Sequence, residues 1–165
     1  MEEQKNANDT PETKEPDRKT EANKSIRNHV IVSVGAGFIP IPILDMVAIT
    51  GVQLNMLRKL SKIYEVPFSE HKVKNIVSSL ICGSGSVPVA GVFASLIKFI
   101  PVVGQTIGSV SLPISAGAIT YAVGKVFLQH FASGGTFLTF DPDKVRDYYN
   151  EMLKEGKTVA ADLKS

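Results

Sequence analysis

The sequence of 165 residues has a single cysteine, Cys82, and only three histidines. One cysteine cannot form an internal disulfide, which fits a reducing compartment. His29, His71 and His130 stand far apart without paired ligands, so we expect no zinc site. A nucleophilic Cys82 would need a nearby histidine and a third group to orient it, and its surroundings in the sequence show neither. We therefore predict no catalytic residue and no metal.

Nucleotide-binding motifs are also missing. Glycines cluster at Gly35–Gly37, Gly83–Gly85 and Gly134–Gly135, but none of these clusters completes a phosphate-binding loop. The tripeptide Gly156–Thr158 lacks the glycine five residues earlier that such a loop requires. The sequence therefore predicts no cofactor, and we expect the protein not to be an enzyme.

Charge of either sign is scarce in the middle of the chain. Over Asn75–Phe140 the only fixed charges are Lys98 and Lys125. Two apolar runs result, Ile76–Ile97 and Phe99–Gly124. Each is long enough as a helix to cross a hydrocarbon core of ~30 Å, which takes roughly 20 residues. These runs predict membrane-inserting segments.

The remaining charge lies at the two ends of the chain and in the link Arg58–Lys74. The net charge is only +2 with both signs interspersed, which argues against a protein that binds nucleic acid. The first residues are polar and acidic without an apolar stretch, unlike a secretory signal. We therefore expect any membrane contact to come from the internal segments.

Two turns divide the apolar part into helical hairpins. Pro101 lacks an amide hydrogen and Gly104 tolerates any backbone angle, so Lys98–Gly104 predicts the turn between the two apolar runs. Pro40 and Pro42 predict the other turn, with Pro42 in the first turn of the following helix. Both hairpins would then return to the side that carries the basic link.

The pattern predicts an all-α protein of helical hairpins, rich in glycine and proline, with apolar membrane-inserting segments and a C-terminal amphipathic helix. A disordered polar tail, the hairpin domain and the amphipathic helix would cover residues 1–23, 24–140 and 141–165. An extended link is expected at Thr136–Phe140. The expected helices cover about residues 24–37, 43–64, 70–82, 87–100, 106–131 and 141 onward.

Small residues recur at helical spacing in the second apolar run, at Gly104, Gly108, Ala116, Thr120 and Gly124. In a membrane such spacing lets helix backbones approach closely. In a soluble bundle the same residues allow tight core packing. The pattern favours intimate helix contact in either solvent.

Asp45 stands out because its neighbours are apolar. An unpaired buried carboxylate is costly, so this one should be paired, protonated or engaged at a helix start. Lys98 lies at comparable depth near the other turn, and we predict an Asp45–Lys98 contact that joins the two hairpins. The alternative is that Asp45 interacts with the first-turn amides of its own helix.

A motif opens at Pro40–Asp45 and continues at Gln53, Met56, Tyr64, Lys98, Pro101, Gly104, Thr120, Tyr121 and Gly124. With these residues, the stretch from about Val30 to Phe131 resembles a bacterial domain family of unknown function. That family occurs in YcjF-like inner-membrane proteins and is appended to some Era-like GTPases. The resemblance implies a helical, membrane-linked module with no established activity. This chain has no GTPase domain, so a GTPase that acts in trans is an analogy.

Together these features predict an uncharacterised, non-enzymatic, membrane-associated helical module that anchors a cytoplasmic partner, such as a GTPase in trans, at membrane lipid. The excess of basic residues in the link places it and both termini on the cytoplasmic side of a bacterial inner membrane. Two alternatives stay open. One is a membrane-active or pore-forming homo-oligomer that associates through its small-residue faces, and the other is a soluble helical scaffold.

Overall fold

The computed structural model describes residues 11–37, 42–82 and 108–163. Within these ranges the protein is all-helical, as the sequence predicts, and contains no strand. The helices are α1 (Pro11–Ala36), α2 (Pro42–Ile63), α3 (Glu70–Cys82), α5 (Gly108–Ala132) and α6 (Arg146–Asp162).

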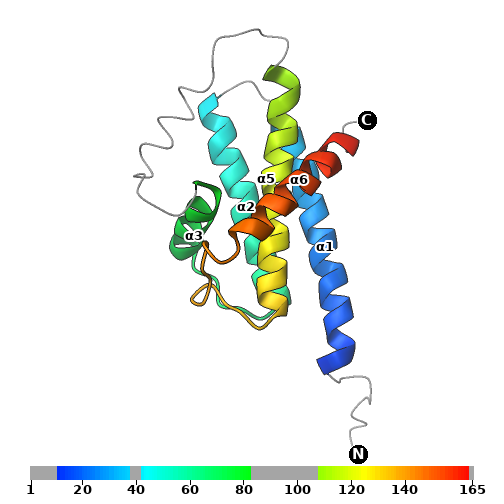
Figure 1. Cartoon of the computed structure of the whole chain (residues 1–165), viewed down its shortest axis with the longest axis vertical. Coiled ribbons are helices and arrows are strands. Elements are labelled where there is room, and N and C mark those ends of the chain that lie inside the picture. The colour runs from blue at the N-terminus through cyan, green and yellow to red at the C-terminus, as the bar shows by residue number, and fades with distance from the viewer. Residues whose placement is uncertain (1–10, 38–41, 83–107, 164–165) are drawn as a thin grey trace, which may run out of the picture.

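Helix α5 is the central helix of the bundle (Figure 1). It contacts α1, α2 and α6, and α1 and α2 also contact each other. Helix α1 runs antiparallel to α2 and α5, while α6 crosses α5 obliquely and the short α3 lies beside α2. The C-terminal end of α1 and the N-terminal ends of α2 and α5 therefore meet at the same end of the bundle.

The core forms where the apolar stripes of the helices face one another. On α1, Ala22, Ile26, Val30 and Val34 are buried at intervals of four residues, the spacing that keeps side chains on one helix face. The other helices contribute buried side chains in the same way: Leu54, Met56, Leu57 and Leu60 from α2, Val73, Val77 and Leu80 from α3, and Tyr149, Met152 and Ala160 from α6.

Aromatic rings close the core at the C-terminal end of α5. The rings of Phe127 and Phe140 stack with their centroids 4.4 Å apart, and those of Phe131 and Phe137 meet edge to face at 5.1 Å. Such pairs add about 0.5–1.5 kcal/mol beyond the burial of their area. The predicted extended link at Thr136–Phe140 is therefore wrong. The segment forms a turn because Phe137 and Phe140 fold back into the core.

Proline and capping residues mark the starts of α2 and α3 correctly. Helix α2 begins at Pro42, where a missing amide hydrogen costs no helical hydrogen bond. Helix α3 begins at Glu70, directly after the predicted cap residue Ser69, with its acidic side chain near the positive end of the helix dipole.

Helix α5 ends as predicted in the segment Ala132–Gly135. Gly134 has a φ of 80°, which glycine adopts without strain. The amide of Gly135 donates to the carbonyl of His130 and the amide of Gly134 to that of Phe131, both at 2.9 Å. This pair of hydrogen bonds satisfies the last carbonyls of the helix.

Helix α1 begins at Pro11, so the prediction of a disordered tail is wrong from that residue onward. Ala22 is fully buried and extends the apolar stripe of α1 toward the N-terminus. The Arg18 guanidinium pairs with the Glu65 carboxylate at 2.8 Å, which ties the polar part of α1 to the turn after α2. A lone alanine among charged residues is a weak hydrophobic signal, and the polar composition therefore concealed the helix.

Helix α6 begins at Arg146 and not at the predicted start, Asp141. The Asp141 carboxylate accepts a hydrogen bond from the amide of Asp143 at 3.1 Å, which closes a turn before the helix. The Arg146 side chain then donates to the carbonyls of Ser79 and Leu80 at 3.3 and 3.4 Å. These carbonyls belong to the last described turn of α3, so Arg146 ties the start of α6 to that helix.

Among the residues that the structure describes, no helix combines the length and the apolar character needed to cross a membrane. The run at Ile76–Ile97 is helical through Cys82 in α3, and its remainder lies outside the described residues, as does the predicted turn at Lys98–Gly104. The described part of the second run belongs to α5, which packs against three helices of its own chain. The spanning segments predicted from composition are not found among the described helices.

Small residues let α5 pack closely against its neighbours, as their spacing predicts. A Cβ atom added at Gly124 would lie 2.8 Å from Cγ1 of Ile26 on α1. A Cβ atom added at Gly156 on α6 would lie 2.8 Å from the carbonyl oxygen of Ala118 on α5. Only glycine allows approaches this close without displacing the partner helix.

Replacing Gly156 by alanine is expected to lower the free energy of unfolding. Overpacking costs about 1–3 kcal/mol, whereas alanine gains roughly 1 kcal/mol over glycine inside a helix. The cost of overpacking should exceed the gain in helix propensity, because the nearest atoms belong to the Ala118 backbone and cannot rotate away. Urea unfolding followed by circular dichroism measures the difference.

The same substitution at Gly51 is the matched control. Nothing lies within 4 Å of a Cβ atom added there, so Gly51→Ala should raise the free energy of unfolding by about 0.5–1 kcal/mol. If Gly156→Ala stabilised the protein as much as Gly51→Ala, the close packing of α6 on α5 would be wrong.

Candidate functional site

Several residues of the sequence motif lie outside the described part of the chain: Pro40, Lys98, Pro101 and Gly104. Pro42 and Asp45 are in the first turns of α2, but their side chains are not among those described. The predicted Asp45–Lys98 contact therefore stays a prediction, as does its alternative at the helix start.

Two motif residues meet at the junction of α2 and α5. Met56 is fully buried, and a Cβ atom added at Gly124 would lie 3.1 Å from its sulfur. Gln53 lies one turn earlier on the same helix and is also buried, with no hydrogen-bond partner for Nε2 within the described residues. These positions form a packing surface between helices.

Thr120 makes the one buried side-chain hydrogen bond between α1 and α5 that the described residues show. Its hydroxyl lies 2.9 Å from that of Ser33, and both residues are fully buried. Either hydroxyl can donate. Because a buried hydroxyl without a partner is costly, this pair fixes how far α1 is shifted along α5.

Tyr121 and Tyr64 lie at different places on the bundle. The Tyr121 hydroxyl donates to the Glu155 carboxylate at 2.6 Å, which joins α5 to α6. Burial, reinforced by this carboxylate, raises the pKa of Tyr121 far above its usual value. Burial also raises the pKa of Tyr64, whose ring lies 6.2 Å from that of Phe131. The described motif residues therefore stabilise the fold at separate points and do not gather in one pocket.

Charge is distributed unevenly along the three long helices. Helix α1 has no lysine, arginine, aspartate or glutamate after Arg27, and α5 has none before Lys125. In α2, Asp45 is the single charged residue before Arg58. The charge-free parts of α1 and α5 and the N-terminal part of α2 meet at one end of the bundle (Figure 1). We call this the uncharged end, formed by residues 28–36, 46–57 and 108–124. The charged C-terminal half of α6 packs beside it, with Ala160 against Gly117.

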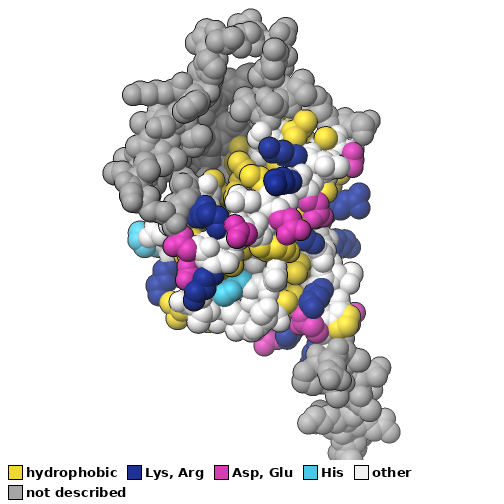
Figure 2. Space-filling model, in the orientation of Figure 1, with side chains coloured by type: hydrophobic (Ala, Val, Ile, Leu, Met, Phe, Trp, Pro, Cys, Tyr) yellow, Lys and Arg dark blue, Asp and Glu magenta, His cyan; other side chains and the backbone are white. Residues whose placement is uncertain are grey.

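Large apolar side chains are exposed on the uncharged end. Ile31 and Val32 on α1 have 47% and 53% of their surface exposed. Leu138 is 77% exposed and belongs to the turn that follows the C-terminal end of α5. That end of α5 lies opposite the uncharged end (Figure 1). By contrast, Lys and Arg side chains alternate with Asp and Glu over the face that carries α6 (Figure 2).

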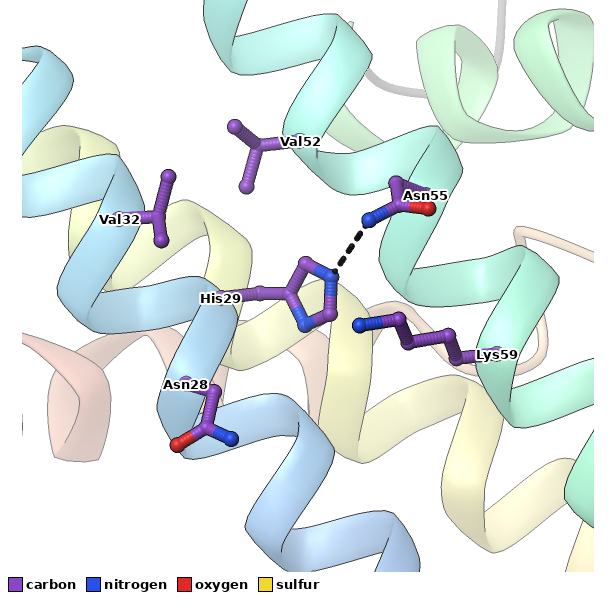
Figure 3. A pocket seen from close by; sticks show the side chains of 6 residues that line it. All are labelled: Asn28, His29, Val32, Val52, Asn55 and Lys59. Carbon is purple, nitrogen blue, oxygen red and sulfur yellow. Dashed lines mark hydrogen bonds between the residues drawn. The ribbon is translucent and has the colours of Figure 1, made fainter.

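A cleft of about 190 Å³ opens between α1 and α2 at the border of the uncharged end, and all of its lining residues except Lys59 belong to that end. It has an apolar part formed by two valines and a polar part formed by two asparagines, a histidine and a lysine (Figure 3). The lining residues are Asn28, His29 and Val32 from α1 and Val52, Asn55 and Lys59 from α2.

His29 forms the buried wall of this cleft. Its Nδ1 lies 2.7 Å from the Ser25 carbonyl, which can only accept, so Nδ1 carries the proton. The Asn55 amide then donates to Nε2 at 3.2 Å (Figure 3). Burial lowers the pKa of His29, and the nearby Lys59 ammonium lowers it further, against the Ser25 carbonyl, which raises it.

The cleft could not be predicted from a sequence motif. His29 has no paired metal ligand in the sequence, and Asn55 and Lys59 belong to no recognised site pattern. A usable signal was present, because Val52, Asn55 and Lys59 are spaced by three and four residues and so share one helix face. Their pairing with His29 depends on the register of α1 against α2, which local patterns do not contain.

Residues 3–158 match the family described as "Domain of unknown function (DUF697)". This chain belongs to the DUF697 family. The resemblance noted in the sequence is thereby confirmed. A relative, "Magnetosome membrane protein 22" of Magnetospirillum gryphiswaldense, is 39% identical over 145 residues, which are 87% of this chain and 74% of the relative. No solved structure matches the chain.

Replacing Thr120 by valine in this DUF697 protein should lower the free energy of unfolding by about 1–3 kcal/mol, because it leaves the buried Ser33 hydroxyl without a partner. The double variant Ser33→Ala, Thr120→Val removes both hydroxyls and should recover most of that loss. Urea unfolding of the native, single and double variants completes the cycle. If the losses simply added, the hydroxyl pair would not be coupled.

The lowered pKa of His29 predicts that stability falls as the medium becomes acidic. Below the ordinary histidine pKa of 6.5 the unfolded chain binds a proton that the folded chain resists, so stability is complete above this pH and is lost below it. Thermal unfolding between about pH 7.5 and about pH 5 measures the loss. The loss should be smaller in His29→Gln.

His71→Gln is the matched control, because His71 is exposed on α3. This variant is expected to keep the native dependence of stability on pH. An equal reduction of that dependence in both variants would contradict the assignment to His29.

Proposed function

We propose that this DUF697 protein is a non-enzymatic helical module that associates with a membrane and holds a cytoplasmic partner there. The name of its relative, a magnetosome membrane protein, supports membrane association. For this chain we propose the bacterial inner membrane, with both termini on the cytoplasmic side, as the excess of basic residues in the link suggests.

The uncharged end carries the proposal. Exposed large apolar side chains normally mark contact surfaces, and Ile31 and Val32 stand where α1 has no charge beyond Arg27. A membrane interface accepts such side chains, because apolar area buried among the lipids stabilises binding. In this arrangement the bundle docks by its uncharged end, and no described helix has to cross the membrane.

The opposite end of the bundle is charged and would face the cytoplasm. It carries Arg58 near the end of α2, together with Lys72 and Lys74 on α3. Lys74 pairs with Glu70 at 2.9 Å and Arg58 with the same carboxylate at 3.3 Å, which leaves a surface of mixed sign. Such a surface suits a protein partner, and the family resemblance suggests a GTPase acting in trans.

A pore-forming oligomer is the weaker candidate. It would need small-residue faces free to bind a second copy, whereas those described are occupied within the chain. A Cβ atom added at Gly117 would lie 2.6 Å from Cγ2 of Val34 and 2.9 Å from Cβ of Ala160. Gly124 is closed in the same way by Ile26. This packing favours the docking module.

The test is flotation of the protein with vesicles of phosphatidylethanolamine and phosphatidylglycerol. Ile31→Asp should weaken binding roughly tenfold. The reasons are that burying part of an isoleucine is worth about 1 kcal/mol and that anionic headgroups repel a carboxylate. The side chain is 47% exposed, so the fold should tolerate the change, which circular dichroism checks.

Leu138→Asp is the matched control, because Leu138 is an exposed apolar residue in the turn after the C-terminal end of α5, away from the uncharged end. It should bind vesicles as the native protein does. If Leu138→Asp abolished flotation and Ile31→Asp did not, the proposed orientation would be reversed. If the native protein did not float with vesicles, membrane docking itself would be wrong.

A further inference from the structure

The polar part of the cleft between α1 and α2 offers hydrogen-bond donors and a cation. Lys59 contributes its ammonium and Asn55 an amide group, whereas the amide of Asn28, which also lines the cleft, points away from them (Figure 3). The Asn55 amide uses one hydrogen on His29 and keeps a second. No acidic side chain lines the cleft. An arrangement of donors around a positive charge selects an anion.

Some lysines of the described chain pair with a carboxylate, and others, Lys59 and Lys62 among them, have no ion pair within the described residues. Lys19, Lys74 and Lys144 pair with carboxylates at 3.5, 2.9 and 3.6 Å. Lys59 has no hydrogen bond or ion pair within the described residues, and its ammonium points toward the His29 ring (Figure 3). A bound anion would supply the missing partner.

The dimensions and the lining indicate what kind of anion fits. A cleft of about 190 Å³ exceeds the roughly 30 Å³ that a water molecule occupies in the liquid. Val32 and Val52 form its apolar part, and Val32 is also exposed on the uncharged end. The site therefore suits a small anionic group attached to an apolar body.

We propose that this cleft binds the phosphate of an anionic lipid headgroup, with Lys59 as counterion and Asn55 as donor. The inference rests on the proposed membrane docking, because docking by the uncharged end brings the cleft to the headgroup layer. Val32 and Val52 then face the start of the acyl chains. Docking would then depend on the anionic headgroup as well as on apolar contact with the lipid.

The test compares binding of the full chain to phosphatidylcholine vesicles with and without phosphatidylglycerol. Lys59→Gln should reduce the preference for phosphatidylglycerol about tenfold, the loss expected when a charge-assisted hydrogen bond to an anion is removed. Binding to pure phosphatidylcholine should not change. Asn55→Ala should reduce the preference in the same direction by a smaller factor.

Lys62→Gln is the matched control, because Lys62 lies one turn further along α2, is exposed and does not line the cleft. It removes the same charge and so measures the general attraction of a basic surface to anionic lipid. A greater loss with Lys59→Gln than with Lys62→Gln supports the cleft. Equal losses overturn it, because charge alone would then explain the preference.

A titration with soluble glycerol phosphate, followed by the NMR signals of the Asn28 and Asn55 amides, separates the remaining outcomes. If glycerol phosphate shifts these signals but the protein binds no vesicles, the cleft binds a soluble phosphate. Both the lipid headgroup as its ligand and the membrane docking would then be wrong. If vesicle binding depends neither on phosphatidylglycerol nor on Lys59→Gln, the proposal that the cleft binds an anionic headgroup is wrong. The proposed membrane docking would still hold. Weak displacement of bound vesicles by glycerol phosphate supports the proposal.

Discussion

The close packing of α5 against α1 and α6 is the constraint on which the rest of the structure depends. Gly124 admits Ile26 from α1, and Gly156 brings the α6 backbone against Ala118. Larger residues at these points would push the helices apart. Because α5 contacts α1, α2 and α6, such a displacement would disturb the packing of all three helices.

This packing also sets the position of each helix along its neighbours. That position determines which side chains lie together on the surface. The Ser33–Thr120 hydrogen bond fixes the shift of α1 against α5. The same register aligns the charge-free part of α1 with that of α5 and places His29 beside Asn55 on α2. The uncharged end and the polar cleft are thus consequences of one arrangement of helices.

Helices that carry their own start and stop signals were predictable. Pro42 marks the start of α2 and Gly134 the end of α5, since each residue favours the backbone that its position requires. Features that depend on tertiary contacts could not be predicted from the sequence. The polar start of α1 is held by Ala22 packing and the Arg18–Glu65 pair, and the cleft exists only in the α1–α2 register. Most motif residues proved structural where they are described, and local sequence does not distinguish a packing residue from a binding residue.

The central claim is that the uncharged end of this DUF697 protein contacts lipid while the charged end does not. An environment-sensitive fluorophore on a single cysteine tests this directly, at Ile31→Cys or at Leu138→Cys in a Cys82→Ser background. On addition of anionic vesicles, the emission should shift to the blue and resist aqueous quenchers at position 31, and stay unchanged at position 138. A blue shift at position 138 alone, or at neither position while the protein binds vesicles, would contradict the account.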